Sequence, residues 1–458
     1  MKKLCLIFIL FLSSIIPANA INEPIPTDFN SWYSQSTPVY FNTDATSKMS
    51  HHIYNDEYLK EYLAKAFTAN YSLKIAKDRI LQYQNLAKEV NSARLPFVSL
   101  SPNANTQRNM STSSGNYTST GFYNLPVQLN WELDIWGKNS LKYQSSKLDV
   151  YAREQELNMT KLSVINDLSV SYFNLIVTDY LIQNTQHRVS NLEQTIKLKE
   201  SLYKNGIISY DDIYLTKYEY SQTIEELNQY QIQYGIFTHQ IYVLMGEVPK
   251  ENLPHSEISN LKIPQSMELN NAELLMFTRP DVLMAKSELD KAHIDVKVAQ
   301  REFLPSVYLN ELIGLSTLSF SDLFNWYSRI YQFGGQVVAD LYTGGYKKAN
   351  LNYNRQVLQE KMHNYYSVLL NSIKETQDIL TTLDNDYKSY LEYKKILGDS
   401  IEYKKITLSR FNSGISSRID YLDAERQVYI NSKYLNIYTS KVLVDLANLN
   451  KSLGRVEI

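Results

Sequence analysis

The chain carries one structural plan twice, at an offset of 208 residues. Gly345 follows Gly137 at this distance (345 − 137 = 208), and each glycine stands between a strand-like stretch and a long helical pattern. Gly414 follows Gly206 by the same distance (414 − 206 = 208), and each interrupts a helical pattern. Solenoid proteins repeat units of about 20–50 residues many times. Two long copies indicate instead an internal duplication with pseudo-twofold symmetry.

The strand-like stretch of the first copy, Leu125–Lys138, alternates between apolar and polar residues before it becomes helical. The alternation covers about 11 residues, the length that a tilted strand needs to cross a bilayer. We predict that its even-numbered side chains line the lumen of a barrel: Gln128, Asn130, Glu132 and Asp134. A paired-carboxylate site at Glu132 and Asp134 fits the alternation less well. Residues 330–347 repeat the pattern in the second copy.

Each copy begins with a helix that ends at a Leu-Pro pair, followed by a strand and a polar loop. Proline is expected at such an end because it lacks an N–H and its ring clashes with the preceding turn. Glu311 interrupts the apolar face of the strand in the second copy, which leaves the register of that strand open. The predicted helix, strand and loop are 55–94, 97–107 and 108–121 in the first copy, and 273–303, 306–315 and 316–329 in the second.

A long helical hairpin follows in each copy. Apolar residues recur at steps of three, four and seven, the spacing of a coiled-coil seam, and no proline occurs from 127 to 248 or after Pro305. Asn205-Gly206 and Asn412-Ser413-Gly414 are typical helix stops. We predict antiparallel hairpins over 138–245 and, in the second copy, up to residue 453. A helix over 138–204 would be roughly 100 Å long, far more than the ~30 Å of a bilayer core.

The N-terminus has the pattern of a secretory signal peptide. Two lysines precede the apolar run Leu4–Ile16, and Ala18-Asn19-Ala20 follows, which is typical of a cleavage site. The single cysteine, Cys5, lies in this segment. The mature chain is therefore expected to have no disulfide, catalytic thiol or cysteine metal site. No other apolar run approaches the ~18 residues of a membrane-spanning helix.

These patterns divide the chain into five segments. Each repeat is predicted to hold a helix, two barrel strands and a helical hairpin. From the N-terminus, the segments are a signal peptide (1–20), an extended arm (21–50), the first repeat (51–246), a connector with three prolines (247–271) and the second repeat (272–458).

Four strands per chain cannot close a transmembrane barrel, for which eight are a practical minimum. Open sheet edges are not tolerated in lipid, because their backbone groups stay unpaired. Two copies of the chain would supply eight strands and three would supply twelve, and either assembly would join the hairpins into a helical tube. We expect an α+β membrane protein in which a β-barrel continues into a long helical duct. A net charge of −2 gives no indication of nucleic acid binding.

Three motifs make the chain resemble the TolC-type outer-membrane efflux proteins over nearly all of its mature length: Trp131–Lys138 (WELDIWGK), Arg279–Val282 (RPDV) and the Leu304-Pro305 strand start. The first two are most similar to the branch that serves resistance–nodulation–division pumps. The resemblance implies a homotrimer with a twelve-stranded barrel in the Gram-negative outer membrane and a periplasmic α-barrel. It also implies a passive exit duct for small molecules, loaded by a periplasmic adaptor (membrane fusion) protein and an inner-membrane pump.

The resemblance implies functional residues at the hairpin tips. Asp420 and Asp423 match the family's aspartate ring at the periplasmic constriction, where a threefold repeat of carboxylates would favour cations. Taken from the sequence alone, a solvated helix start is the better interpretation, because the helix dipole favours Asp there. The positions that match adaptor-contacting tips are Gly206, Ile207, Gly414 and Ile415.

The family closes its entrance with a tyrosine–aspartate–arginine link between hairpins, and this chain departs from that pattern. Asp212 matches the aspartate, but Phe411 and Ser416 stand at the tyrosine and arginine positions. Neither can make the usual hydrogen bond or ion pair. Closure would then rely on packing and the acidic ring, or on another cation such as Arg410 or Arg418.

The sequence gives no sign of enzyme chemistry. The seven histidines are scattered, and there is no phosphate loop, G-x-S-x-G or dinucleotide fingerprint. We expect no cofactor and no metal. Two other functions remain open: a type I protein secretion channel of the same architecture, and a secreted coiled-coil structural protein or adhesin. The alternating strands and the duplication favour a channel, but they do not identify its cargo.

Overall fold

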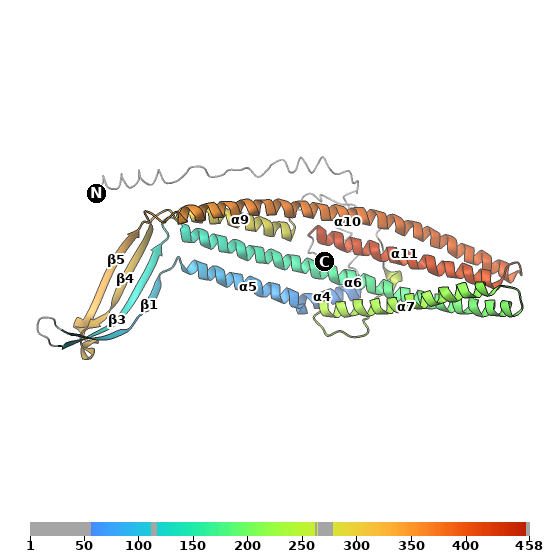
Figure 1. The fold of residues 1–458 in the computed structure, drawn as a ribbon, viewed down its shortest axis with the longest axis horizontal. Helices are drawn as coiled ribbons and strands as arrows, with labels where there is room; N and C mark the ends of the chain where they lie inside the picture. The colour runs from blue at the N-terminus through green and yellow to red at the C-terminus, as the bar shows by residue number, and fades with distance from the viewer. Residues whose placement is uncertain (1–55, 111–116, 262, 264–277, 455–458) are drawn as a thin grey trace.

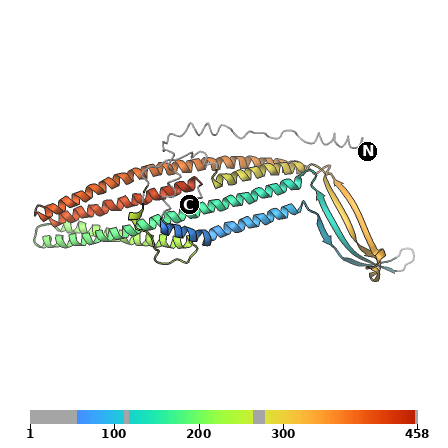
Figure 2. The same cartoon turned by 180° about the vertical axis from the view of Figure 1, so that it is seen from behind.

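The computed structural model describes residues 56–110, 117–261, 263 and 278–454. The molecule is elongated, with a sheet at one end and the tips of two helical hairpins at the other (Figure 1; the opposite side is shown in Figure 2). The predicted signal peptide, 1–20, and extended arm, 21–50, lie outside the described residues.

The sheet is antiparallel throughout. β3 pairs on one side with β1 and β2, which lie along successive parts of it, and on the other side with β4, which pairs with β5. The strands are β1 (Phe97–Leu100), β2 (Asn103–Met110), β3 (Tyr117–Leu133), β4 (Ser306–Thr317) and β5 (Arg329–Val338). The loop predicted over 108–121 was wrong at both ends, because β2 continues to Met110 and β3 begins at Tyr117.

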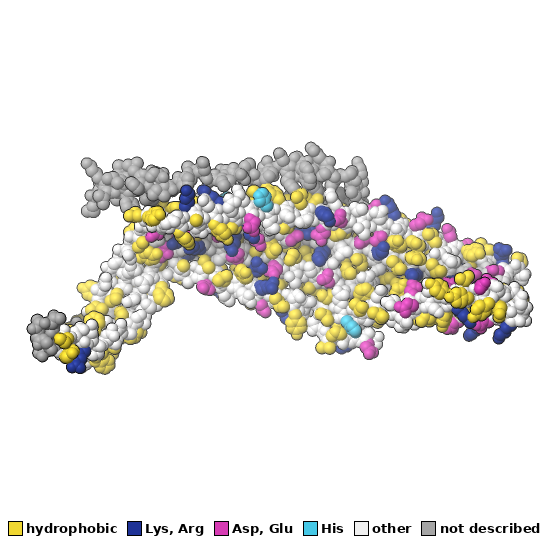
Figure 3. Space-filling view, viewed as in Figure 1, with side chains coloured by type: hydrophobic (Ala, Val, Ile, Leu, Met, Phe, Trp, Pro, Cys, Tyr) yellow, Lys and Arg dark blue, Asp and Glu magenta, His cyan; other side chains and the backbone are white. Residues whose placement is uncertain are grey.

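The strand register places apolar residues of neighbouring strands side by side. Val127 pairs with Ile313 and Ile313 with Tyr331, and all three side chains are exposed. Glu311 pairs with Leu129 and Phe333, so the alternation of the strands puts this carboxylate on the apolar face. Figure 3 shows hydrophobic side chains at the surface of the sheet end. The other face carries amide side chains, among them Gln128, Asn130, Asn310, Gln332 and Gln336, which line one shallow pocket.

Two pairs of helices form the hairpins. α6 and α10 have 67 residues each, and α7 and α11 have 35 each. None of the described helices combines the length and apolar character needed to cross a membrane. The helices are α4 (Glu57–Ala69), α5 (Tyr71–Ser92), α6 (Lys138–Lys204), α7 (Tyr210–Leu244), α9 (Pro280–Arg301), α10 (Tyr346–Asn412) and α11 (Arg418–Ser452).

The single helix predicted over 55–94 is two helices, because Asn70 leaves the helical conformation with ψ at 127°. Its side chain accepts a hydrogen bond from the backbone N–H of Leu73 and donates one of 2.8 Å to the carbonyl of Leu244. The same residue therefore caps α5 and ties it to the end of α7. The main apolar core lies nearby and includes Leu59, Leu168, Tyr172, Ile241 and Leu446.

The two tryptophans of the WELDIWGK motif hold the junction between sheet and helices. Trp131 Nε1 donates to the carbonyl of Arg94 (2.9 Å), and Trp136 Nε1 donates to that of Pro305 (2.7 Å). Arg94 directly precedes the Leu95-Pro96 pair, and Pro305 belongs to the Leu304-Pro305 pair. A strand starts directly after each pair. The motif therefore fixes where the first helix of each repeat passes into the sheet.

Asp134 lies after the end of β3 at Leu133, so the prediction that it is a strand residue was wrong. Its carboxylate accepts from the backbone N–H groups of Asn139 (2.8 Å) and Ser140 (2.7 Å). These are unpaired donors of the first turn of α6, so Asp134 caps that helix. Glu132 lies within β3 and pairs with Lys138 at 2.6 Å.

Candidate functional site

The hairpin tips lie at the end of the molecule farthest from the sheet (Figure 1). Gly206 and Gly414 take positive φ angles of 70° and 73° at the two turns, a conformation that glycine adopts without strain. The following residues, Ile207 and Ile415, are exposed. Each tip therefore presents an apolar side chain held by a tight turn.

Asp212 and Asp420 occupy equivalent positions in the two returning helices, 208 residues apart (420 − 212 = 208). Each forms a capping box with the serine three residues before it, Ser209 or Ser417. Hydrogen bonds from Ser417 hold the pKa of Asp420 below its usual value. Both carboxylates therefore start a helix, which is the role that the sequence alone suggested for Asp420.

Asp423 differs from Asp420 because a cation neutralises it. Arg426, one turn further along α11, pairs with Asp423 through one terminal nitrogen. Its Nε also lies 3.3 Å from Oε1 of Glu219 on α7. The two aspartates assigned to the ring are thus in different electrostatic settings.

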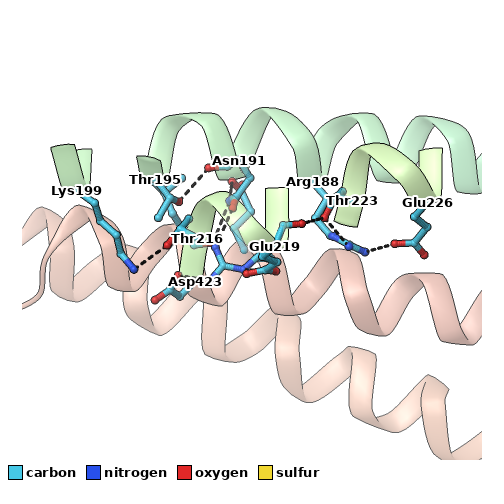
Figure 4. A network of polar contacts seen from close by, with 12 residues as sticks. Arg188, Asn191, Thr195, Lys199, Thr216, Glu219, Thr223, Glu226 and Asp423 are labelled. Carbon is cyan, nitrogen blue, oxygen red and sulfur yellow. Dashed lines mark hydrogen bonds and ion pairs between the residues drawn. The ribbon is translucent and has the colours of Figure 1, made fainter. Parts of the chain in front are cut away.

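Arg426 is the centre of a polar junction between the two hairpins. Its remaining nitrogen donates to Oδ1 of Asn191 on α6 (3.4 Å), and Nδ2 of Asn191 donates to the carbonyl of Leu422 (2.9 Å). Figure 4 shows these contacts reaching from one hairpin to the other. We call Asn191, Glu219, Asp423 and Arg426 the outer brace.

A second junction lies about two helical turns farther from the tips. Oε2 of Glu226 on α7 pairs with Arg188 of α6 at 2.9 Å, and its Oε1 pairs with Lys433 of α11. Arg188 also donates to Oγ1 of Thr223 (2.7 Å) (Figure 4). We call Arg188, Thr223, Glu226 and Lys433 the inner brace.

The inner brace favours the ionised carboxylate of Glu226. Burial opposes ionisation, but hydrogen bonds from Lys433 and Tyr230 and the charge of Arg188 outweigh it, so the pKa of Glu226 lies below its usual value. This carboxylate joins three of the four hairpin helices. Removal of its charge would leave two cations facing each other.

The predicted gate residues make no link of the family type among the residues that the structure describes. Phe411 lies under the guanidinium of Arg418, 5.7 Å from ring centre to Cζ, and Ser416 Oγ donates to the carbonyl of Thr407 (3.4 Å). Arg418 also lies over the ring of Tyr421. The nearby charge of Arg410 contributes to the lowered pKa of Asp420.

The brace residues were not predicted from the sequence. A signal for them exists, because Glu219 and Glu226 are seven residues apart on α7, and so are Arg426 and Lys433 on α11. Seven residues are two helical turns, so each pair faces one direction. Acidic residues on one helix and basic residues on another predict ion pairs between the two helices only if the helices are known to be neighbours.

Within the described ranges, no group of three or more His, Cys, Asp or Glu side chains is arranged to hold a metal ion. The braces are built from cation–carboxylate pairs and amides instead. Chemically, this arrangement can latch two hairpins together and present carboxylates beside the tips.

Comparison with known proteins gives one family. Residues 63–247 and 273–455 match the model described as outer membrane efflux protein, once for each half of the chain. The solvent efflux pump outer membrane protein SrpC of Pseudomonas putida is 23% identical over 88% of this chain and 86% of its own length. The cation efflux system protein CusC of Escherichia coli K12 is 21% identical over 83% of this chain and 82% of its own length.

A solved structure has the same fold. The outer membrane channel CmeC of Campylobacter jejuni superposes with a TM-score of 0.77 and 19% identity, over 92% of this chain and 90% of that one.

Proposed function

Because this chain belongs to the outer membrane efflux protein family, it is an outer-membrane efflux channel, and we propose that it serves as the passive exit duct of a tripartite system. A periplasmic adaptor and an inner-membrane pump would deliver small molecules to the hairpin tips. The pump would supply the energy, and the chain would supply a path through the periplasm and the outer membrane.

The observation that carries this proposal is the open sheet joined to long hairpins. β1 with β2 forms one edge and β5 the other. Unpaired edges are costly in lipid, so sheets of neighbouring copies would close the barrel. Three copies would give twelve strand positions, with Gln128, Asn130 and Glu132 toward the lumen and the apolar face toward lipid.

The equal helix lengths support the proposed duplication. α10 starts 208 residues after α6 (346 − 138 = 208), and α11 starts 208 residues after α7 (418 − 210 = 208). The proposed repeats, 51–246 and 272–458, would give a trimer six similar hairpins. Such a ring can form a closed periplasmic tube.

The outer brace is the proposed latch of the closed entrance, in place of the link that Phe411 and Ser416 cannot make. Arg426 holds Glu219 of the first hairpin and Asp423 of the second at once. Separation of the hairpins would free Asp423, which would join Asp420 in the proposed selectivity ring. Opening would therefore increase the negative charge at the entrance and favour cations.

The exposed tips support adaptor contact at Gly206, Ile207, Gly414 and Ile415. Apolar side chains that the turns keep rigid lose little entropy on binding. The cargo is left to the pump, because the two relatives are named for different cargoes: cations for CusC and solvents for SrpC.

The test is single-channel conductance of the mature protein in planar bilayers, compared with the Asp420→Asn, Asp423→Asn variant. We expect small, cation-selective openings in the wild type and weaker selectivity in the variant. Unchanged selectivity would contradict the proposed selectivity ring but not the proposed channel. If neither the wild type nor the Arg426→Gln variant inserts and conducts, the duct is refuted.

A further inference from the structure

The apolar face of the sheet ends in a cation on the side far from the helices. Arg329, the first residue of β5, pairs in register with Leu315, which in turn pairs with Leu125 of β3. Residues paired across strands share a face of the sheet, so this arginine belongs to the apolar face. Figure 1 shows the β4–β5 connection at the end of the sheet opposite to the helices. Arg329 therefore marks the outer rim of the apolar face.

Aromatic side chains surround this arginine. Cζ of Arg329 lies 3.1 Å from the centre of the Trp326 ring, which is 75% exposed. On the same rim, Phe320 packs edge-to-face against Tyr123, with ring centres 5.5 Å apart. Figure 3 shows hydrophobic and basic side chains together at this end of the molecule. Aromatic girdles of this kind are typical of the boundary between the hydrocarbon and the headgroups of a membrane.

The height of the apolar face fits the same boundary. At its inner end Val337 pairs with Val307, which pairs with Leu133 beside the helix junction. Arg329 lies eight residues away (337 − 329 = 8), about 26 Å along a strand. A tilt of about 40° reduces this to a height of roughly 20 Å, close to the ~25 Å apolar band of membrane barrels. On the proposed barrel, Arg329 therefore lies at the level of the lipid headgroups.

A second arginine shares the face but lies farther from the helices. Arg108 of β2 pairs with Ser119 of β3, six residues beyond Leu125 (125 − 119 = 6). An even separation along a strand returns to the same face. Six residues correspond to about 20 Å of strand, or roughly 15 Å of height at the same tilt. Cζ of Arg108 lies 4.6 Å from the centre of the Tyr117 ring, so two arginine–aromatic pairs stand at two levels.

This part of the sheet is poor in acids. Residues 95–131 contain no Asp or Glu, and residues 312–339 contain one, Asp322. Oδ1 of Asp322 accepts from Nδ2 of Asn325 at 3.0 Å. Within the described ranges, Arg108 and Arg329 lie against aromatic rings and form no ion pair with a carboxylate. Both guanidinium groups are therefore available to an anion from outside the chain.

We propose that Arg329 and Arg108 bind phosphate groups of a glycolipid in the outer leaflet, one at each level. The planar guanidinium matches phosphate in geometry and charge. The headgroup layer of a phospholipid bilayer extends only ~5–8 Å beyond the hydrocarbon core, so a phospholipid reaches Arg329 but not Arg108. A lipid with a large, phosphorylated sugar headgroup reaches both. This inference rests on the proposed barrel and names the lipid that surrounds it.

Lipid binding by the detergent-purified full chain tests the site. The protein is titrated with lipopolysaccharide, whose sugars carry phosphates, and with phosphatidylglycerol, and bound lipid is counted by native mass spectrometry. We expect Arg329→Gln to weaken the binding of both lipids about 5-fold and Arg108→Gln to weaken only that of lipopolysaccharide. Phosphatase treatment of the lipopolysaccharide should weaken its binding to the wild type. The matched control is Arg355→Gln on α10, which should bind both lipids like the wild type.

The outcomes separate the lipid site from the proposed function. If the wild type conducts in planar bilayers but both arginine variants bind lipopolysaccharide as it does, the site is overturned and the channel is not. If Arg108→Gln weakens the binding of phosphatidylglycerol as much as that of lipopolysaccharide, the ligand is an ordinary anionic phospholipid and the glycolipid assignment is wrong. A wild type that binds lipopolysaccharide but does not conduct, even as Arg426→Gln, would contradict the channel and leave the lipid site.

Discussion

Arg426 of α11 lies with its Nε 3.3 Å from a carboxylate oxygen of Glu219 on α7, so a single guanidinium connects the two hairpins near their tips. The same side chain also neutralises Asp423. In the proposed channel, the strength of the latch and the charge of the entrance therefore both depend on Arg426. Any change that releases Arg426 alters both properties together.

Substitution Arg426→Gln should favour the open entrance. It removes a charge-assisted contact worth about 1–2 kcal/mol and leaves Glu219 and Asp423 as unpaired acids near each other. We expect the open fraction in planar bilayers to rise about 5- to 30-fold and cation selectivity to increase. Lys374→Gln, which breaks an exposed pair with Asp378 on α10, is the control and should conduct like the wild type. Equal conductance of Arg426→Gln and wild type would contradict the latch.

Substitution Glu226→Gln should destabilise the hairpins more than it affects the gate. Arg188 and Lys433 would face each other without their common carboxylate, and a broken buried pair costs about 3 kcal/mol. Thermal unfolding and hydrogen exchange of α6, α7 and α11 measure this loss. Glu225→Gln, at the exposed neighbouring position, should have little effect. If both variants unfold like the wild type, the inner brace has no structural role.

The stability of the helical region should fall as the pH rises from about 4 to 7. Burial, and then the nearby charge of Asp386, raise the pKa of Asp445 to about 7, although Lys441 opposes them. Between the unfolded and folded pKa values only the folded state keeps the proton, so the free energy of unfolding decreases with pH across this window. We therefore expect Asp445→Asn to raise the melting temperature at pH 8 and to leave it nearly unchanged at pH 4. An equal shift at both pH values would exclude this titration.

Substitution Glu311→Leu should stabilise the assembled barrel. Glu311 pairs in register with Leu129 and Phe333 on the apolar face, where an acidic side chain costs less than the ~2–4 kcal/mol of a basic one at the bilayer centre. We expect a gain of about 1 kcal/mol, seen as a higher dissociation temperature of the trimer on a semi-native gel. Gln332→Leu changes the opposite face and should give no such gain. A less stable Glu311→Leu trimer would mean that the carboxylate has a partner in the assembly.

The sequence predicts the hairpins well because their signals are local. Gly206 and Gly414 fall at the observed turns, and serine–aspartate capping boxes start α7 and α11 directly after them. The break at Asn70 was missed, since its cause is a hydrogen bond to Leu244, which is distant in the sequence. The extended ends of β2 and β3 were missed because Ser, Thr and Asn at both faces hide the alternation.

The candidate site was harder to predict, because it depends on which helices are neighbours. Arg426 and Asn191 are 235 residues apart and Lys433 and Glu226 are 207 apart. Helical spacing shows that such side chains share a face, but it does not show what that face meets. The family resemblance directed attention to Phe411 and Ser416, whereas the observed link uses positions farther from the turn.

The two tryptophan contacts at the sheet junction have a consequence for how the halves of this chain can diverge. Trp131 and Trp136 lie in the first copy but bond to carbonyls in both, at Arg94 and Pro305. The corresponding positions of the second copy are Ala339 and Gly344, which have no indole to donate. The first half of the chain therefore supplies the indole contacts of both junctions, whereas Ala339 and Gly344 supply none. Tolerance to substitution should therefore be lower at Trp131 than at Ala339, 208 residues later.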